Sequence, residues 1–326
     1  MEKVPVVSVL IPTYNYAHCL DEAITSVLTQ TFTSFELIII DDCSKDNTDE
    51  VVKKYLQDPR VRYFKNERNL GLVGNWNKCV SMAGGKYIKL LCADDKFRND
   101  LLMKMVDAME SHPTVSLVCS NKQIFGSTLS EVKLPLQYFH KGQEIINNTL
   151  TTYGWLGEPT CVMFRSANLH VGAFRTDVTW LPDWEMWLRQ LSVGDAYLIP
   201  EPLAFVRIHE QQVTKTVMKR YINYFEEYDL SKNIRDKNGY DIDTSGIDMN
   251  QVVKFRAEKC ALAMYKLLPF VFKKAERKIF AKAAKIAWKE GVLVSSLKQL
   301  FVKKPAKTIL TIENIRPEKT PAQNVI

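Results

Sequence analysis

One stretch of the sequence, GKYIKLLCADD at residues 85–95, constrains the fold more than any other. A nearly all-apolar run that follows glycine and ends in two acids is typical of a buried strand in a parallel sheet. Asp94 and Asp95 then lie at the carboxyl end of the strand, where open α/β sheets bind ligands. Two carboxylates there can hold a divalent cation that grips a diphosphate. The alternative is that both acids only turn the chain and cap the next helix.

The first third of the chain alternates strand and helix patterns. Apolar runs predict strands, and apolar residues at helical spacing predict the helices between them. The predicted strands are residues 6–11, 36–41, 61–64, 85–95 and 115–119, and the predicted helices are residues 20–30, 48–56, 75–83 and 101–110. Strands that alternate with helices of this size form a doubly wound, mostly parallel sheet, so we predict an α/β fold.

Beyond residue 121 the regular alternation ends. Residues 135–148 have the composition of a loop or lid with some helix. The later predicted elements are a strand at 160–165, a Trp-rich helix at 182–191 and two short strands at 196–200 and 203–208. From residue 219 the pattern is helical almost to the end, so a helical region follows the strands.

The basic residues are concentrated near the C-terminus. The chain of 326 residues has a formal net charge of +7, and residues 251–307 contain fifteen Lys or Arg against three Glu. Ile279, Ala283, Ile286 and Val294 lie among these lysines. This basic amphipathic pattern suits an anionic membrane surface. The alternative is an ordinary solvated face of a helical appendage.

The sequence also indicates where the protein works. It contains no run of the roughly 18 to 20 apolar residues that a membrane span needs, and its first residues lack a signal-peptide pattern. Seven widely spaced cysteines without a C-x-x-C pair argue against a disulfide framework and a zinc cluster. We therefore expect a cytoplasmic protein, either free or peripheral on the inner face of the cytoplasmic membrane.

Polar residues follow four of the predicted strands. They are PTYN at 12–15, DDCS at 41–44, NLG at 69–71 and the two acids at 94–95. Each group alone can be turn chemistry or a helix cap. Because they follow successive strand–helix units, they would meet at one sheet edge as an acidic, Asn-rich pocket. Such a pocket can hydrogen-bond a base and ribose, but it needs a cation to accept phosphates.

These motifs, in this order, resemble the inverting nucleotide-sugar glycosyltransferases of family 2, which have the GT-A fold, in their bacterial cell-surface polysaccharide branch. The matching stretches are VSVLIPTYN, LIIIDDCSKDNT, NLGLVGNWN, GKYIKLLCADD, DWEMWLR and PEPLAFVRIHE. The resemblance implies transfer of a sugar, with inversion, from a nucleotide-diphosphate sugar to a hydroxyl of a glycan or lipid-linked acceptor. A UDP-sugar is the expected donor.

The resemblance also implies a division of the chain. A GT-A catalytic domain would span residues 1–214, with a nucleotide-sugar-binding half at 1–121 and an acceptor half at 122–214. The helical, basic C-terminal region would span residues 215–326.

The resemblance assigns donor contacts to residues at the strand ends. These residues are Pro12, Thr13, Tyr14, Asp41, Asn69, Gly71, Asn77, Asp94 and Arg207. Among them, Asp41 would accept a hydrogen bond from the base. Arg207 would reach the diphosphate.

A DXD-like acidic motif implies Mg²⁺ or Mn²⁺ as cofactor. Asp95 would be the direct ligand, and His209 would reach the metal or the diphosphate, unless it is an ordinary surface histidine. The family often has an acid where Cys92 stands. Since a buried thiol is a poor ligand for a hard cation, binding would depend on Asp95, water and the diphosphate.

Asp183 aligns with the family's catalytic base. Inverting transfer to a hydroxyl needs a carboxylate that takes the acceptor proton while the metal stabilises the departing diphosphate. Glu185 is close in sequence, but the two acids point in different directions on a helix, so we favour Asp183. The alternative is that both are solvated acids of a first helical turn. Arg189 is expected to pair with a nearby acid.

The sequence also bears on other classes of function. An inactive nucleotide-sugar-binding protein in a polysaccharide assembly complex would share this pocket, and Cys92 is its main support. The basic region lacks the interleaved aromatics that stack bases, so we expect no nucleic-acid partner. The absence of a Walker loop and of G-x-G-x-x-G disfavours ATP hydrolysis and dinucleotide redox chemistry. The cluster of Trp155, Trp180, Trp184 and Trp187 suits either sugar stacking or core packing.

Overall fold

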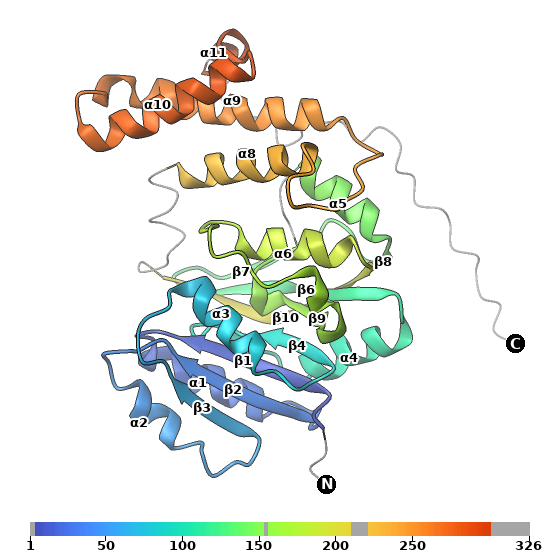
Figure 1. Ribbon diagram of the computed structural model, residues 1–326. Helices are drawn as coiled ribbons and strands as arrows, with labels where there is room; N and C mark the ends of the chain where they lie inside the picture. The colour runs from blue at the N-terminus through green and yellow to red at the C-terminus, as the bar shows by residue number, and fades with distance from the viewer. Residues whose placement is uncertain (1–3, 153–155, 210–220, 301–326) are drawn as a thin grey trace, which may run out of the picture.

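The computed structural model describes residues 4–152, 156–209 and 221–300. One ten-stranded sheet lies in the lower part of Figure 1, and a stack of helices lies above it. The strand order is β3-β2-β1-β4-β9-β6-β10-β5, with β7 beside β6 and β8 beside β10. This sheet, with its connecting helices, confirms the predicted α/β fold class.

The first half of the sheet is parallel. β1 (Val7–Thr13) lies between β2 (Phe35–Asp41) and β4 (Tyr87–Leu90), and β3 (Val61–Lys65) lies outside β2. β1 and β2 are almost entirely buried, as expected for central strands covered on both faces. The strand predicted over 85–95 is shorter, because the chain leaves the ladder after Leu90 and places its two acids in a loop.

Helices connect these strands and cover the sheet. They are α1 (Ala17–Leu28), α2 (Thr48–Lys53), α3 (Leu72–Ser81) and α4 (Leu101–Ser111). α3 packs against β1 and β2, whereas α4 packs against β6 and β10. The backbone N–H groups of Leu70 and Gly71, just before α3, bond to a side chain that follows β2. The start of α3 therefore lies at the carboxyl edge of the parallel strands.

The second half of the sheet is mixed. β9 (Val162–Arg165) runs antiparallel to β4 and β6 (Val115–Gly126), and β6 pairs in parallel with β10 (Asp195–Ile208). The short strands are β5 (Lys96–Phe97), β7 (Ser130–Val132) and β8 (Tyr138–His140). β10 replaces the two predicted short strands, with register shifts on either side of Pro202. Proline has no N–H to donate, so the ladder is irregular there without ending.

Among the described residues, three helical segments lie between β8 and the Trp-rich helix. They are α5 (Gly142–Thr151), η1 (Pro159–Cys161) and η2 (Ser166–Val171). α6 (Pro182–Leu191) begins and ends where the Trp-rich helix was predicted.

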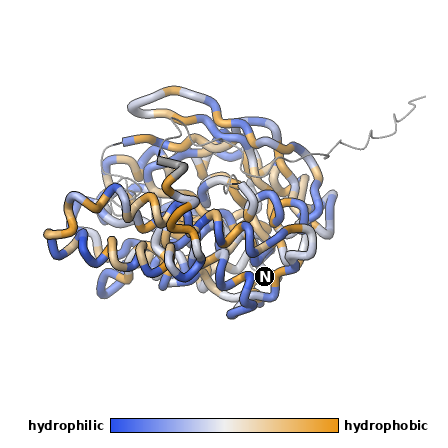
Figure 2. Tube along the Cα trace, turned by 90° about the horizontal axis from the view of Figure 1, so that it is seen from above, coloured by the Kyte–Doolittle hydropathy of each residue, from blue (hydrophilic) through white to orange (hydrophobic). Residues whose placement is uncertain are grey.

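The C-terminal helices stack on the part of the chain that contains the sheet. They are α8 (Ile222–Arg235), α9 (Met249–Leu267), η3 (Leu268–Phe270), α10 (Lys274–Lys289) and α11 (Leu293–Leu300). Leu230 of α8 and Val252 of α9 belong to the same core as the sheet, while α10 packs on α9 through a second apolar cluster. In Figure 2 the helices at the left alternate hydrophobic and hydrophilic residues along their turns. Among the described residues, none of the helices has the length and apolar character to cross a membrane.

Candidate active site

A cavity of about 490 Å³ lies at the carboxyl edge of β1, β2 and β4. We call it the donor cavity. Its walls come from segments far apart in sequence, with one residue after β2 and two on β10. The segments are residues 12–16, 69–76, 92–95, 158–159 and 179–183. The position matches the rule that open α/β sheets bind ligands at the carboxyl ends of their strands.

Thr13 and Tyr14 form the part of this wall that follows β1. Thr13 is 2% exposed, and its hydroxyl has no hydrogen-bond partner among the residues that the structure describes. The next loop is fixed by Asn15, whose backbone N–H donates to Ser44 Oγ at 2.8 Å and whose Oδ1 accepts from Lys45 N at 2.8 Å. A buried hydroxyl without a partner is costly, so a ligand that bonds to Thr13 would remove that cost.

Asp42 lines the donor cavity, and Asp41 does not. The Asp41 carboxylate is fully buried and accepts hydrogen bonds from Ser44 N at 2.9 Å and Tyr63 Oη at 3.2 Å. Asp42 accepts from Leu70 N at 2.7 Å and Gly71 N at 2.9 Å. The predicted contact between Asp41 and a base is therefore not supported by its position. Successive side chains at a strand end point to opposite sides, and the sequence pattern alone did not say which acid faces the cavity.

Asn69 and Gly71 line the cavity, as predicted, and Asn77 does not. Asn77 forms two hydrogen bonds with the backbone of Phe174. Its Nδ2 donates to the Phe174 carbonyl at 2.8 Å, and its Oδ1 accepts from the Phe174 N–H at 2.9 Å. Its amide therefore connects α3 to the segment before α6. Asn75, two residues earlier on α3, lines the cavity and was not predicted.

The two acids after β4 form the centre of the cavity floor. The Asp95 carboxylate is 3% exposed and accepts from Thr160 Oγ1 at 2.6 Å and from the backbone N–H of Arg207 at 2.9 Å. Asp94 Oδ2 lies 3.0 Å from His209 Nε2. Burial, together with the neighbouring Asp94 charge, raises the pKa of Asp95 well above its usual range. A bound cation would therefore be stabilised by the Asp94 and Asp95 carboxylates, because it would offset their mutual repulsion.

These residues fit a divalent cation. Ligand atoms of Cys92, Asp94 and Asp95 all lie within 4.8 Å of one another. Two carboxylates supply the oxygen ligands that Mg²⁺ and Mn²⁺ prefer. Burial raises the pKa of the Cys92 thiol well above its usual range, so the thiol stays protonated and contributes little as a ligand. His209 is adjacent but does not line the cavity.

Arg207 points away from the donor cavity, contrary to its predicted contact with the diphosphate. Val206 and Ile208, its neighbours on β10, line the cavity, so strand alternation turns Arg207 to the other side. Its Nε donates to the carbonyl of Asp94 at 2.9 Å, and its Nη2 pairs with Glu22 at 2.9 Å. Arg207 therefore supports the loop that carries the two acids.

Asp183 lies in the first turn of α6 and lines the donor cavity. Its Oδ1 accepts from Trp184 N at 2.9 Å. Burial raises the pKa of Asp183 to about 7. Glu185 is fully buried and forms a bidentate ion pair with Arg189, at 2.8 and 2.6 Å, so it has no access to the cavity. Of the two acids, only Asp183 is placed to exchange a proton with a bound molecule.

A family model confirms what this geometry suggests. The model for glycosyl transferase family 2 matches residues 8–171, half of the chain. The chain belongs to this family.

Two relatives of this family 2 glycosyltransferase are named for polysaccharide biosynthesis. WcaA of Escherichia coli, named for colanic acid biosynthesis, is 27% identical over 73% of this chain and 85% of its own length. TuaG of Bacillus subtilis, named for teichuronic acid biosynthesis, is 37% identical over 32% of this chain and 42% of its own length.

Solved structures show the fold. Residues 1–349 of S. aureus TarS in complex with UDP-GlcNAc match with a TM-score of 0.67 at 17% identity, over 88% of this chain and 83% of that chain. The mannosyltransferase PcManGT of Pyrobaculum calidifontis, in complex with GDP-Man and Mn²⁺, matches with a TM-score of 0.56 at 17% identity, over 93% and 89%. The predicted GT-A fold is confirmed.

A buried lysine lies beneath the glycosyltransferase's acidic pair. Lys89 of β4 is fully buried. Its ammonium donates to the carbonyl of Thr160 and also to the carbonyls of Pro159, at 3.1 Å, and Val162, at 3.2 Å. Burial lowers the pKa of Lys89 to about 8. The ammonium thus holds the backbone of η1, which carries the hydroxyl that bonds to Asp95.

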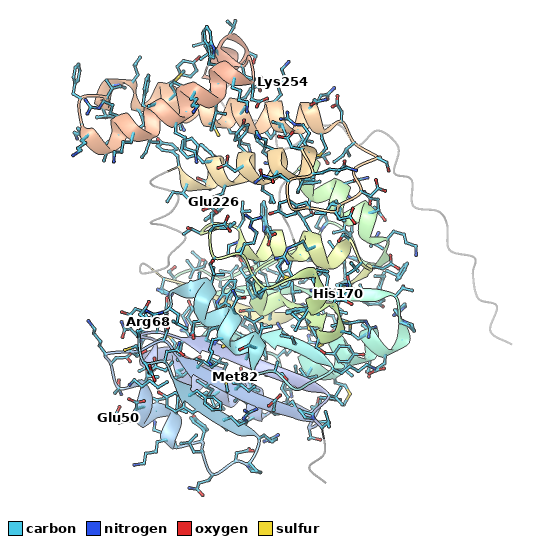
Figure 3. The ribbon with its side chains drawn as sticks, in the orientation of Figure 1. Glu50, Arg68, Met82, His170, Glu226 and Lys254 are labelled. Carbon is cyan, nitrogen blue, oxygen red and sulfur yellow. The ribbon has the colours of Figure 1, made fainter. Side chains whose placement is uncertain are left out.

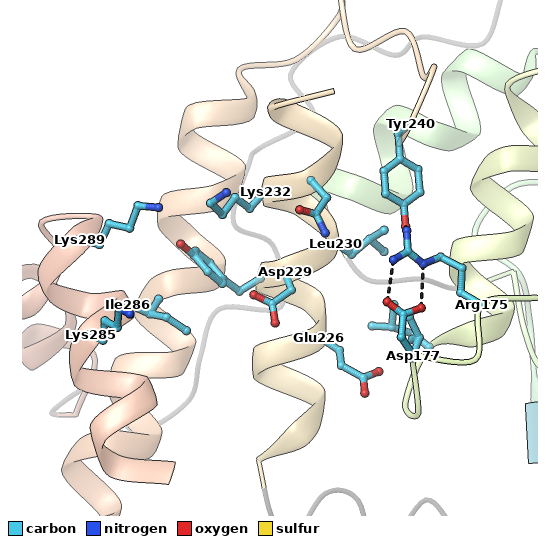
Figure 4. A pocket seen from close by; sticks show the side chains of 14 residues that line it. Arg175, Asp177, Glu226, Asp229, Leu230, Lys232, Tyr240, Lys285, Ile286 and Lys289 are labelled. Atoms are coloured by element: carbon cyan, nitrogen blue, oxygen red, sulfur yellow. Dashed lines mark hydrogen bonds and ion pairs between the residues drawn. The ribbon is translucent and has the colours of Figure 1, made fainter. Parts of the chain in front are cut away.

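The helical region of the glycosyltransferase holds the segment that leads into α6. Glu226, labelled in Figure 3, accepts from the backbone N–H groups of Thr179 at 2.9 Å and Trp180 at 2.7 Å. A cavity of about 410 Å³ lies between residues 175–181, α8 and α10. Figure 4 shows the side chains that line it, among them Arg175, which pairs with Asp177 at 2.6 Å. Thr179 and Trp180 line the donor cavity, so Glu226 of α8 fixes the segment that forms the wall beside Asp183.

Proposed function

We propose that this protein transfers a sugar from a nucleotide-diphosphate sugar, expected to be a UDP-sugar, to a hydroxyl of a glycan or lipid-linked acceptor, with inversion. One observation carries the proposal: a carboxylate pair suited to a metal and a separate carboxylate with a raised pKa line the same cavity. The carboxylate pair, with a bound cation, would stabilise the leaving diphosphate, and the separate carboxylate would take the proton of the attacking hydroxyl. Both family membership and the GT-A fold support this reading.

The nucleotide would lie against the walls that follow β1 and β2. Thr13 offers its unpaired hydroxyl, Tyr14 offers a ring that is 41% exposed, and Asn69 and Gly71 lie opposite. Asp42, which lines the cavity where Asp41 does not, would be the acid beside a bound base. Pro12 completes this wall.

Mg²⁺ or Mn²⁺ would be held by Asp95 and Asp94. When bound, the cation would neutralise the diphosphate and stabilise it as a leaving group. Thr160 and the backbone N–H of Arg207 orient the Asp95 carboxylate. His209 bonds to Asp94 and would orient that second carboxylate.

Asp183 would act as the base. The acceptor oxygen forms a bond to the anomeric carbon as the bond from that carbon to the diphosphate oxygen breaks, and the acceptor proton passes to the Asp183 carboxylate. A pKa of about 7 lets this group be ionised before the reaction and hold a proton after it. Displacement from the face opposite the leaving group inverts the anomeric configuration.

The acceptor class follows from the relatives and from the basic helices. Two relatives are named for polysaccharide biosynthesis, so we propose a growing surface polysaccharide or its lipid-linked precursor. The lysines of α10 would bring the enzyme to an anionic inner membrane surface from the cytoplasm. The proposed catalytic domain is residues 1–214, with the helical region after it.

The test is product analysis with purified protein, Mn²⁺ and a panel of nucleotide sugars. We expect donor hydrolysis with one member of the panel and, with an acceptor, a product of inverted anomeric configuration by NMR. Asp95→Ala should abolish both transfer and Mn²⁺-dependent binding of UDP. If UDP binds equally well to the parent and to Asp95→Ala in the presence of Mn²⁺, the metal assignment fails. Donor binding without any turnover would support the inactive binding protein instead.

A further inference from the structure

We propose that a second cavity, beside the donor cavity, binds an uncharged pyranose unit of the acceptor that carries the attacking hydroxyl. The proposal rests on the proposed function and names the substrate class of the same site. The second cavity has a volume of about 430 Å³ and lies between β6, the chain after β7, η1 and the start of α6. This volume is in the range of about 300 to 1,000 Å³ that is typical of small-molecule sites.

The two cavities meet at the proposed base. Glu158, Trp180 and Asp183 line both the donor cavity and the second cavity. A donor on one side of Asp183 and a hydroxyl on the other would each have access to the reaction centre. A molecule bound in the second cavity can therefore present its hydroxyl to the Asp183 carboxylate without displacing the nucleotide.

An unpaired hydroxyl in the wall of the second cavity indicates a polar ligand. Ser120, on β6, is 1% exposed, and its Oγ has no hydrogen-bond partner in the described part of the chain. A buried hydroxyl normally has a partner, because leaving one unpaired costs free energy. A sugar hydroxyl can both donate and accept, and it would satisfy this group.

Two aromatic rings in the same wall suit the apolar face of a sugar. Trp180 and Trp184 are half-buried and line the second cavity, whereas Trp187 is 1% exposed and belongs to the core. Aromatic faces combine a large apolar contact area with a fixed orientation. Pyranose C–H groups can pack on them while the hydroxyls reach Ser120 and Asp183.

The charges of the second cavity favour an uncharged unit. The Lys122 ammonium bonds to Glu158 Oε1 at 2.6 Å, so its charge is compensated within the wall. Lys133 is exposed and lies 4.0 Å from Glu131. A carboxylate or phosphate in this cavity would meet the negative charge of Asp183 when that residue is ionised as the base, and both lysines of the described wall already have an acidic partner. The sugar that carries the attacking hydroxyl is therefore uncharged, even where the polymer is acidic elsewhere.

The experiment compares transfer with donor hydrolysis in the full-length protein. The donor is the nucleotide sugar that is hydrolysed with Mn²⁺, and the acceptor probes are octyl β-glucoside, octyl β-galactoside, octyl α-mannoside and octyl β-glucuronide. We expect transfer to at least one neutral glycoside and none to the glucuronide. Trp184→Leu should lower the ratio of transfer to hydrolysis about tenfold. Ser120→Ala should raise the acceptor KM about threefold to tenfold.

The matched control is Trp288→Leu, which removes a tryptophan that is 78% exposed on α10 and outside both cavities. This variant should change neither donor hydrolysis nor transfer to the glycosides. Unchanged acceptor KM and transfer ratio in both cavity variants would overturn the proposal, as would a parent enzyme that hydrolyses the donor but transfers to no neutral glycoside. Equal transfer to the glucuronide would overturn the preference for an uncharged unit. A parent enzyme without any donor hydrolysis would instead refute the proposed function itself.

Discussion

Asp183 and Glu185 are two residues apart on α6 and have opposite surroundings. One lines the donor cavity with a pKa of about 7, and the other is buried against Arg189. We expect Asp183→Asn to keep donor binding and lower kcat by about 10² to 10⁴, because the proton transfer occurs only in the transition state. Steady-state kinetics with the identified donor would measure this loss. A near-normal kcat in folded Asp183→Asn would remove this residue from the mechanism.

Glu185→Gln is the comparison variant. It should keep its kcat but lower the free energy of unfolding by about 3 to 5 kcal/mol, since it leaves the Arg189 charge without its buried partner. Urea unfolding of both variants would separate the two effects. If Glu185→Gln is inactive while still folded, the base is Glu185.

The raised pKa of Asp183 also predicts a pH dependence. The base must be ionised, so kcat/KM should rise about tenfold per pH unit below about 7 and level off above it. The folded-state pKa lies above the unfolded value of about 3.9, so the contribution of this group to stability is fully present below about pH 4 and is lost as the pH rises through 7. Asp183→Asn should remove the contribution of this group, so its melting temperature should fall less than that of the parent between pH 4 and 7. A rate profile that is flat from pH 5 to 8 would contradict the assignment.

The sequence predicted which segments form the site better than it predicted which side chains of those segments face the donor cavity. Thr13, Asn69, Asp95 and Asp183 all line the donor cavity, because each follows a strand end or opens a helix whose position the pattern already indicates. Asp41, Asn77 and Arg207 do not. Each occupies the right segment but faces the other way, and that direction depends on register and neighbours, which the sequence pattern does not contain.

At the scale of elements, η1 illustrates how a short segment can position a proposed metal ligand. Its Thr160 hydroxyl donates to Asp95 at 2.6 Å, and the Lys89 ammonium donates to the carbonyls of Pro159 and Thr160. We expect Thr160→Val to weaken Mn²⁺ binding about 10- to 100-fold, as for other residues that orient a metal-bound carboxylate. Titration of Mn²⁺ followed by electron paramagnetic resonance, with UDP present, would measure it. Thr160→Ser keeps the hydroxyl and should bind Mn²⁺ like the parent, so equal affinity in all three proteins would exclude this role.

The elements themselves follow the sequence where local pattern decides them. The parallel strands β1 to β3 and the helices α1 to α3 were predicted within a few residues, because apolar runs and helical spacing are local signals, whereas β4 ends five residues before its predicted end. The antiparallel insertion of β9 between β4 and β6 was not predicted, nor was the continuity of β10. Both depend on pairing between segments that are far apart in the chain.

At the scale of the whole molecule, charge and exposed aromatics gather on the helical region. Phe272 is 93% exposed and Trp288 is 78% exposed, close to the lysines of α10. We expect the double variant Lys274→Gln with Lys278→Gln to weaken binding to phosphatidylglycerol-containing vesicles about 20- to 30-fold, at about 1 kcal/mol for each charge. Vesicle flotation at two salt concentrations would measure it.

The control for this membrane prediction carries the same change of charge elsewhere. Lys53 and Lys54 lie on and just after α2, at the opposite end of the molecule in Figure 1, so replacing both with Gln should leave vesicle binding unchanged. Equal losses in both double variants would indicate a response to net charge alone. Binding that ignores salt and all four substitutions would refute an electrostatic anchor.

The position of Lys89 has a consequence for how the chain can be divided. Its ammonium lies on β4, but the carbonyls of Pro159 and Val162 that surround it come from about seventy residues later in the sequence. A fragment of residues 1–121 would lack both those carbonyls and β9, the strand that lies between β4 and β6, so the ammonium would have to be hydrated or lose its proton. We therefore expect the fragment alone to lack cooperative thermal unfolding by circular dichroism, and Lys89→Met to restore part of it. The nucleotide-binding half would then depend on the acceptor half to fold, so the two halves could not be inherited or exchanged as independent modules.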